Sequence, residues 1–452
     1  MRPHIPALRL GRPYESLDQI ELKDSLATVS QVNAGIIRQD LRKIATCRAA
    51  LKPFTVAKLV ELCGRTGELF LNANDPQQYV EALSATSGLP HGLVRRNMQR
   101  IHAMLANMGQ VLRGLTRGLD LDDRNSPYFF FPAADCLGLV MPSNSPSVNS
   151  LWLPAIALKM PVIIKPGRDD PWTPYRLIQS FIAAGTPPEA FGFYPTDHEG
   201  ADTLLQLCGR AMVFGDKSTA EKYAGNPAIQ VHGPGYSKVL IGSDQIGRWP
   251  EFLDVLVDSI AANGGRSCLC ASAIVVPAHA DEIAVALAKR LGPVAPLPPE
   301  NEKATLSGFA NPKVAEAIHA DIEEDLARPG AVDVTAQYRG GPRLANFQGG
   351  TYLRPTIVRC DSFAHPLANR EFLFQYASVV EVAQDTMLEQ IGPSLVVTAI
   401  TRDQRWTEEL MESKHIDRLN IGPISTMNIL WDQPHEGNLF DFLYKRRAFQ
   451  RA

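Results

Sequence analysis

One cysteine stands directly after a pair of glycines, in the stretch Asn-Gly-Gly-Arg-Ser-Cys that ends at Cys268. Because glycine carries no side chain, Gly264 and Gly265 leave room for a substrate or a cofactor ring to approach the sulfur. A thiolate with partial exposure and nearby hydrogen-bond donors is a nucleophile at neutral pH. Burial as a small apolar side chain is the usual fate of a cysteine, and that alternative stays open. Cys268 is therefore a candidate nucleophile for covalent catalysis.

Two further polar residues stand where a predicted strand ends. Asn144 lies in Met-Pro-Ser-Asn-Ser-Pro, after one strand and before a helix, so its amide could donate to a developing oxyanion. The alternative is a capped helix start with prolines that set the turn. Lys165 ends the run Val-Ile-Ile-Lys, and nucleotides bind at the carboxyl ends of parallel strands. A solvated lysine at a strand end is the alternative.

The elements that must position these residues alternate between strand and helix. Residues 17–116 show apolar positions three and four apart and predict a helical N-terminal region. The positions that carry this pattern are Ile20, Leu22, Leu26, Val29, Val94, Met98, Ile101 and Leu105. Strands are predicted at 129–131, 136–141, 161–165, 211–215, 229–233 and 271–277, then at 394–400 and 418–422. The helices between them predict two α/β domains with parallel sheets.

Composition excludes several classes of protein. The 452 residues include 45 basic and 48 acidic side chains, for a net charge of −3, which gives no basic surface for nucleic acid. Hydrophobic residues make up 45% of the chain, so disorder is not expected. The longest uncharged stretch, 136–158, carries several Pro, Ser and Asn residues, and it does not predict a membrane span.

The seven cysteines are scattered, without zinc-type spacing, and no HExxH motif occurs. We therefore expect reduced thiols, a cytoplasmic location and no metal site.

From about residue 126 onward, seven segments in order resemble the aldehyde dehydrogenase superfamily. They are PSN (142–144), IIKPGRDDPWTP, AAGTPPEAFGFYP, VFGDKSTAEKY, NGGRSC, GGTYLRPTIV and REFLF. The resemblance implies two parallel-sheet α/β domains, a nicotinamide cofactor and a segment that forms homodimers or homotetramers. It divides the chain into 1–245 (helical region plus dinucleotide-binding domain), 246–415 (catalytic domain) and 416–452 (bridging segment).

The resemblance also implies roles for individual residues. Cys268 is expected to be the nucleophile, and the Asn144 amide is expected to hold the oxyanion with the Cys268 backbone N–H. The expected cofactor contacts are Lys165 at the adenine ribose, Gly215 and Ser218 in the pyrophosphate turn, Gly233 after a strand, and Glu371 at the nicotinamide ribose.

One departure from the family concerns the residue that activates water. Hydrolytic members have E-L-G-G-K, whereas the corresponding stretch here begins Gln230–Val231–His232 and holds no carboxylate. Because general-base help is worth ~10²–10⁴-fold, a thioacyl enzyme without it hydrolyses slowly, while a thiol such as coenzyme A needs less help.

The string HGPGxSK is similar to the fatty acyl-CoA reductase branch. We expect an oxidoreductase that interconverts an acyl-CoA and an aldehyde, with coenzyme A as co-substrate. His232 would act as proton donor or base, although a structural histidine remains an alternative. The alternative functions are a hydrolytic aldehyde dehydrogenase and a catalytically silent scaffold.

A second departure lies three residues after Lys165. NAD-preferring relatives have a glutamate there, whereas this chain has Arg168, which pairs well with a 2′-phosphate. The sequence therefore predicts NADP(H) in preference to NAD(H). Alternatively, Arg168 pairs with Asp169 or Asp170.

Overall fold

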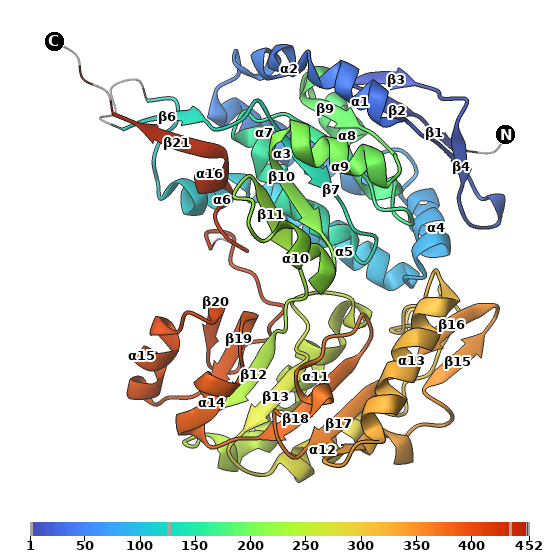
Figure 1. The fold of residues 1–452 in the computed structure, drawn as a ribbon, viewed down its shortest axis with the longest axis vertical. Helices are drawn as coiled ribbons and strands as arrows, with labels where there is room; N and C mark the ends of the chain where they lie inside the picture. Colours follow the sequence, from blue (N-terminus) through green and yellow to red (C-terminus); the bar gives the residue numbers. More distant parts are fainter. Residues whose placement is uncertain (1–2, 124–127, 434–435, 449, 451–452) are drawn as a thin grey trace. The chain divides into compact units, whose positions relative to one another are not determined.

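The computed structural model describes residues 3–123, 128–433, 436–448 and 450. These residues form two compact units (Figure 1). The first unit contains residues of 1–86, 94–233 and 430–452, and the second contains 87–93 and 234–429. The C-terminal segment thus returns to the unit in which the chain starts.

The first unit is built on a seven-stranded sheet. Its strand order is β11 (Ile229–His232), β10 (Gly209–Phe214), β7 (Cys136–Val140), β8 (Val162–Lys165), β9 (Phe191–Phe193), β2 (Ala7–Arg9) and β3 (Arg12–Tyr14). The first five strands are parallel, and β2 and β3 add antiparallel strands at one edge. Because parallel strands point the same way, the loops after β11, β10, β7 and β8 lie along one edge of this sheet.

Helices cover both faces of this sheet. They are α1 (Ala34–Leu41), α2 (Ile44–Leu51), α3 (Val56–Asn72), α4 (Pro76–Ser87), α5 (His91–Ala106), α6 (Met108–Thr116), α7 (Leu153–Ala157), α8 (Trp172–Ala184), α9 (His198–Leu207), α10 (Lys217–Tyr223) and α16 (Leu439–Leu443). Six of them, α1 to α6, form most of the N-terminal region of the chain. Gly138 of β7 shows how closely α9 packs, since a Cβ there would lie 2.6 Å from a methyl carbon of Leu204.

The predicted helix over Ile20–Val29 is wrong. These residues form β4 (Gln19–Glu21) and β5 (Thr28–Ser30), which join β1 (His4–Ile5) in a three-stranded sheet. The physical reason is visible in the burial pattern: Ala27 and Val29, which are buried, are two apart, and residues two apart share one face of a strand but not of a helix. The helix predicted around Val94–Leu105 is confirmed as α5.

The second unit carries its own seven-stranded sheet. The strand order is β14 (Ala331–Asp333), β17 (Thr356–Cys360), β18 (Tyr376–Glu381), β13 (Ala273–Val276), β12 (Lys238–Ile241), β19 (Ser394–Ile400) and β20 (Ile416–Ile421), with only β14 antiparallel. Its helices are α11 (Leu253–Ala261), α12 (Ala280–Leu291), α13 (Pro312–Leu326), α14 (Gln384–Gln390) and α15 (Gln404–Glu412). A hairpin of β15 (Leu344–Phe347) and β16 (Gly350–Leu353) is added.

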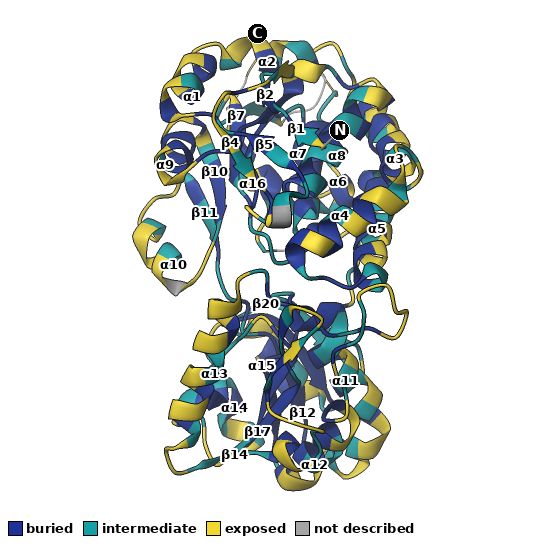
Figure 2. Cartoon of the chain, turned by 90° about the vertical axis from the view of Figure 1, so that its right-hand side faces the viewer, coloured by how far each residue is buried: buried dark blue, intermediate teal, exposed yellow. Residues whose placement is uncertain are grey.

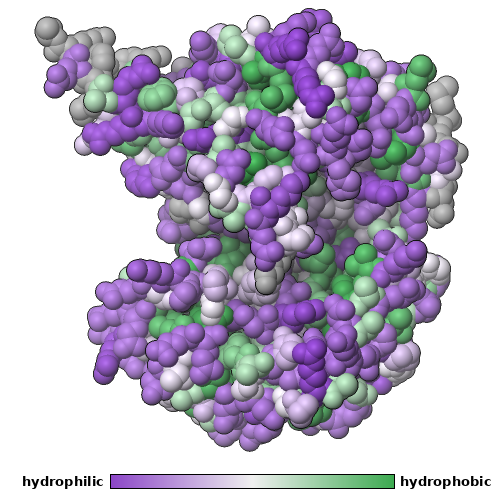
Figure 3. Space-filling view, in the orientation of Figure 1, coloured by the Kyte–Doolittle hydropathy of each residue, from purple (hydrophilic) through white to green (hydrophobic). Residues whose placement is uncertain are grey.

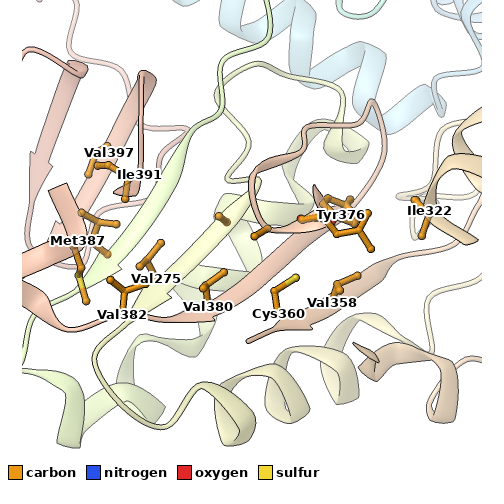
Figure 4. Packing of buried hydrophobic residues seen from close by; sticks show 14 of the residues in the cluster. Val275, Ile322, Val358, Cys360, Tyr376, Val380, Val382, Met387, Ile391 and Val397 are labelled. Atoms are coloured by element: carbon orange, nitrogen blue, oxygen red, sulfur yellow. The ribbon is translucent and has the colours of Figure 1, made fainter. Parts of the chain in front are cut away.

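Two apolar clusters, one on each face of this sheet, form the core of the second unit. Figure 4 shows one of them, in which Met387 of α14 lies near Val275 and Val382, and Val380 and Val358 lie farther along the same face of the sheet. Strands covered on both faces read as continuous apolar runs, which is why the sequence predicts a parallel sheet here. Figure 2 shows the buried strands of each unit and the exposed outer sides of the helices.

The remaining described strands form a pair whose members are far apart in the sequence. β21 (Tyr444–Arg447) pairs antiparallel with β6 (Phe129–Pro132).

Hydrophilic residues dominate the face of the molecule in Figure 3. No helix in the described part of the chain is long and apolar enough to cross a membrane.

Candidate active site

The loop that carries Cys268 is shaped by its glycines. After α11 the chain forms a short turn in which Asn263, Gly264 and Gly265 have φ values of 52°, 68° and 74°. A Cβ on Gly265 would lie 2.3 Å from the carbonyl carbon of Phe374, and one on Gly264 would lie 2.5 Å from Ser307 Oγ. The glycines are therefore required by the fold of the loop itself, which is a stronger constraint than room for a substrate.

Cys268 differs from the other cysteines in exposure. It is half-buried, whereas Cys47, Cys63, Cys136, Cys208, Cys270 and Cys360 are buried. Burial raises the pKa of Cys63 and of Cys360 to about 12, so these thiols are inert at neutral pH. Cys268 is the most accessible cysteine of the described chain.

Within the second unit, the segment after β11 packs directly against the loop that carries Cys268. Ser237 Oγ donates to the Cys268 carbonyl at 2.7 Å. A Cβ on Gly235 would lie 2.2 Å from that same carbonyl oxygen, so only glycine fits there. Gly235 and Ser237 thus fix the backbone of Cys268 from one side.

Glu371 and Lys238 meet on this same segment. Glu371 Oε2 accepts from the Tyr236 backbone N–H at 2.6 Å, and Lys238 Nζ donates to the Tyr236 carbonyl at 2.6 Å. Lys238 also donates to Ser394 Oγ at 3.0 Å. Burial lowers the pKa of Lys238 to about 7, against a favourable effect of Glu371. Glu371, predicted as a ribose contact, is held beside the nucleophile loop by a backbone N–H.

Two arginines that sequence reasoning missed support the same loop. Arg266 is buried, donates to the carbonyls of Ser87 (2.8 Å) and Gly308, and lies over the Phe309 ring. Arg418, on β20, interacts electrostatically with Cys268. The sequence signals were an arginine inside the cysteine motif and a charge within the predicted strand RLNIG.

In the first unit, the loops after β7 and β8 touch each other. The backbone N–H of Asp169 donates to Ser143 Oγ at 3.0 Å, and a Cβ on Gly167 would lie 2.4 Å from the Pro142 carbonyl. These adjacent loops carry Asn144 and Lys165, so the structure brings these two predicted residues to one edge of the sheet. Burial lowers the pKa of Lys165.

Asn144 is not a helix cap. The 3₁₀ helix that follows begins after Ser145, whose side chain makes no capping hydrogen bond. Ser145 Oγ instead donates to Asn97 Oδ1 at 3.1 Å, and the Ser147 N–H donates to the same Asn97 oxygen at 3.3 Å. The capped-helix alternative for Asn144 therefore does not hold.

Arg168 is exposed, and of its two alternative partners, Asp169 and Asp170, the second is engaged elsewhere. Asp170 is buried and accepts from the backbone N–H and the hydroxyl of Thr173, at 2.9 and 2.8 Å. Burial raises the pKa of Asp170 to about 6. Within the described residues no ion pair of Arg168 is seen, so its guanidinium is available to a ligand.

The expected pyrophosphate turn carries a carboxylate of its own. Asp216 caps α10 by accepting from the Thr219 N–H at 2.9 Å, and the Ser218 hydroxyl donates to it at 2.6 Å. These bonds, the one from Ser218 first, lower the pKa of Asp216. Gly215 is needed because a Cβ there would lie 2.4 Å from Thr219 Oγ1. Ser218 is therefore bound to Asp216 in this structure.

His232 ends β11 and is held by a distant carboxylate. Its Nδ1 is hydrogen-bonded to Glu436 Oε2, and its ring stacks on Phe214 with centroids 4.6 Å apart. Glu436 is itself fixed, since Gln230 Nε2 donates to its carbonyl at 2.5 Å. The Nε2 atom of His232 is buried and has no hydrogen-bond partner among the described residues. Such an imidazole is oriented by one nitrogen and available at the other.

A nicotinamide dinucleotide fits part of this edge. Lys165 and Arg168 supply cationic donors after β8, and a Cβ on Gly233 would meet no atom within 4 Å, which leaves open space after β11. Asp216 is the one departure, because it places a carboxylate at the turn after β10. Among the described residues, no group of three or more His, Cys, Asp or Glu side chains could hold a metal ion.

Solved structures with the same fold are aldehyde dehydrogenases. The aldehyde dehydrogenase KauB from Pseudomonas aeruginosa superposes with a TM-score of 0.80 at 16% identity, over 99% of this chain and 96% of that one. An NAD+ complex of an aldehyde dehydrogenase from Bacillus cereus gives 0.79 at 15% identity, over 98% and 96%. Aldehyde dehydrogenase 21 from Physcomitrella patens, in complex with succinate, gives 0.77 at 16% identity, over 99% and 95%. These likenesses confirm the predicted fold class.

By sequence alone, no curated protein matches the chain. The model of the aldehyde dehydrogenase family matches residues 23–385, which is most of the chain and includes the larger part of each seven-stranded sheet. That match confirms the family seen in the sequence motifs, without singling out a branch. The chain belongs to the aldehyde dehydrogenase family, whose members are NAD(P)-dependent enzymes.

Proposed function

We propose that this enzyme interconverts an acyl-CoA thioester and an aldehyde through a thioacyl intermediate on Cys268. The observation that carries the proposal is His232, an imidazole oriented by Glu436 through Nδ1 where the family's hydrolytic members have a glutamate. Imidazole both gives and takes a proton near neutral pH, which suits a thiol that leaves in one direction and attacks in the other. His232 is three residues from Gly235, which packs against Cys268.

The chain's own residues divide the steps among them. In the reductive direction the Cys268 thiolate attacks the thioester carbonyl, and the Asn144 amide with the Cys268 N–H stabilises the oxyanion. The C–S bond to coenzyme A breaks, and His232 gives its proton to the departing sulfur. A bound NADPH supplies hydride in this reaction. Cys268 then leaves as thiolate when the thiohemiacetal collapses to the aldehyde, so the net consumption is one hydride and one proton.

The residues proposed to hold the dinucleotide are those that the family resemblance implies. Lys165 and Arg168 would contact the adenosine half, with Arg168 at the 2′-phosphate because its guanidinium is exposed. Gly215, Ser218 and Gly233 would lie along the pyrophosphate. Glu371 would accept from the nicotinamide ribose, in addition to the bond it already takes from Tyr236. Arg168 supports NADP(H) as the preferred cofactor, and the proposed acyl transfer requires coenzyme A as the co-substrate.

A hydrolytic dehydrogenase is the second candidate. The observation that favours it is the same pair, because an imidazole with its Nδ1 on a carboxylate and a bare Nε2 is also a suitable base for water. In that reaction His232 would take a proton from water as it attacks the thioacyl carbon.

Oxidation of an aldehyde by NADP+ with and without coenzyme A separates the two functions. The proposal expects steady turnover only with coenzyme A, and an acyl-CoA product by mass spectrometry. Steady release of free acid without coenzyme A would overturn the proposal in favour of hydrolysis. Aldehydes of several chain lengths and aromatic aldehydes should be compared.

A further inference from the structure

Arg418 lies on an edge strand of the sheet in the second unit. This strand is next to side chains that Cys268 contacts. It is the third residue of β20 and pairs in parallel register with Val396 of β19. Val396 belongs to a small apolar cluster with Leu269, Cys270, Leu395 and Met427, and Cys268 packs against that same cluster. The arginine and the cysteine therefore border one group of side chains.

A hydrogen bond ties the guanidinium to a segment that packs beside Cys268. Arg418 Nη2 donates to the carbonyl of Asn428 at 2.9 Å. Asn428 stands between Met427 and Ile429, both of which belong to or pack on the cluster that Cys268 contacts. A guanidinium keeps its charge at every physiological pH.

Electrostatics connects the two residues. Burial is the main influence on Arg418 and lowers its pKa, while Cys268 acts in the opposite direction, as an anionic thiolate beside a cation would. In a partly buried site the attraction between opposite charges is screened much less than at the surface.

We propose that Arg418 stabilises the thiolate of Cys268 and thereby sets the reactivity of the nucleophile. The thiol S–H bond breaks, the proton passes to solvent, and the sulfur keeps the electron pair beside a guanidinium that does not change its charge. The inference rests on the proposed role of Cys268, but it does not depend on whether coenzyme A or water receives the acyl group. Arg418 would act on the reaction only through the effect of its charge on Cys268, without contacting the substrate.

Other charged groups near this loop come from each element packed on it. Glu371 and Lys238 lie on the Tyr236 segment, and Asp258 of α11 accepts from Ser425 at 2.5 Å, close to Met427. Lys238 has a pKa of about 7 and so carries only part of its charge at neutral pH. Arg266, two residues before Cys268, is also a constant cation, but its guanidinium is bound to the carbonyls of Ser87 and Gly308. Arg418, like Arg266, keeps its charge across the range in which a thiol titrates.

The test is the rate at which Cys268 is alkylated by iodoacetamide across pH 5–10, with no cofactor or substrate present. Labelling is followed by mass spectrometry of the Cys268 peptide, and Cys268→Ala shows the background from other thiols. In Arg418→Gln, which keeps a hydrogen-bond donor but loses the charge, we expect the rate at pH 7 to fall about ten-fold. The pH of half-maximal rate should rise by about one unit, because one unit is a ten-fold change in the ionised fraction.

Three further measurements keep the outcome unambiguous. Arg418→Lys retains the charge and should retain most of the rate, whereas a purely structural role predicts that the Gln and Lys variants behave alike. Iodoacetate, an anion, should lose more rate than iodoacetamide in Arg418→Gln. Arg359→Met removes a half-buried strand arginine paired with Asp281 and serves as the matched control, with thermal unfolding confirming that each variant is folded.

Two results would overturn different statements. If wild-type Cys268 reacts no faster than an exposed model thiol, the nucleophile assignment fails, and with it the proposed function. If the wild type reacts fast and Arg418→Gln has the same rate and pH profile, only the role of Arg418 fails.

Discussion

The imidazole of His232 has two nitrogens in different surroundings. Nδ1 is bonded to Glu436, while Nε2 is buried without a partner among the described residues. The carboxylate fixes the orientation of the ring, as it does in other carboxylate–histidine pairs. In the proposed function, a residue 204 positions away along the chain thus orients His232 for proton transfer.

Replacement of Glu436 by Gln should disturb this preparation without removing the imidazole. We expect kcat of the proposed acyl-transfer reaction to fall about 10–100-fold with little change in KM, because the imidazole loses the carboxylate that orients it for proton transfer. Steady-state kinetics measures both constants. The exposed Glu199→Gln is the matched control. An unchanged kcat in Glu436→Gln would mean that the pair is only structural.

Arg168 allows a second test at the scale of one side chain. In Arg168→Ala the KM for NADPH should rise about ten-fold while the KM for NADH changes little, since only the former carries a 2′-phosphate for the guanidinium. Initial-rate kinetics with both cofactors gives the ratio. Arg12, exposed on β3, provides the control substitution. Equal effects on both cofactors would contradict the predicted NADP(H) preference.

At the scale of elements, the nucleophile turn depends on glycine more than on any interaction. Gly265→Ala places a Cβ 2.3 Å from Phe374 at a φ of 74°, so we expect a loss of roughly 2–5 kcal/mol in the free energy of unfolding. Urea denaturation measures it. Gly247→Ala, where a Cβ meets nothing within 4 Å, should change stability by less than about 1 kcal/mol. Equal stabilities of the two variants would show that the turn relaxes at no cost.

Elements with strong local patterns could be predicted from the sequence. β19 is buried along its whole length and reads as a continuous apolar run, and α12 has the apolar spacing of an amphipathic helix. The prediction of a helix from Ile20 to Val29 failed because the apolar residues of two three-residue strands and the turn between them match a helical period by chance. The local sequence pattern therefore predicts whether a long element is a helix or a strand, but it does not distinguish the two for short elements.

The site divides in the same way. Cys268, Asn144 and Lys165 stand in motifs that are contiguous in sequence, so their types and order could be recognised. Arg418 and Glu436 act on residues that lie far from them along the chain, and only the pairing of strands and the return of the C-terminal segment bring them there. No spacing rule in one sequence reports such contacts.

At the scale of the whole molecule, buried charge should make stability depend on pH. The folded pKa of Lys238 is about 7, against about 10.4 for an unfolded lysine. Between these values the unfolded chain binds a proton that the folded chain does not, so the free energy of unfolding rises with pH, by at most about 1.4 kcal/mol per unit. Below pH 7 both states bind it and the slope disappears.

Lys238→Met should remove this slope, which denaturant titrations at pH 7, 8 and 9 will detect as a difference from the wild type. The exposed Lys303→Met is the control and should keep the wild-type slope. A slope retained in Lys238→Met would assign the pH dependence to other groups. The predicted domains, cytoplasmic location and homodimer or homotetramer stay predictions at this scale.

The return of residues 430–452 to the first unit sets an order of events during synthesis. The ribosome makes β11, with His232, and then all of residues 234–429 before Glu436 emerges. Domains generally fold as units while the chain grows, at about 5–20 residues per second, so the second unit is able to fold before the first is finished. For roughly 10–40 seconds of translation His232 lacks its carboxylate partner. A nascent chain halted before residue 430 would thus carry Cys268, the proposed nucleophile, without the carboxylate that orients His232. If the proposed function is right, acyl transfer becomes possible only after the C-terminal segment has been synthesised.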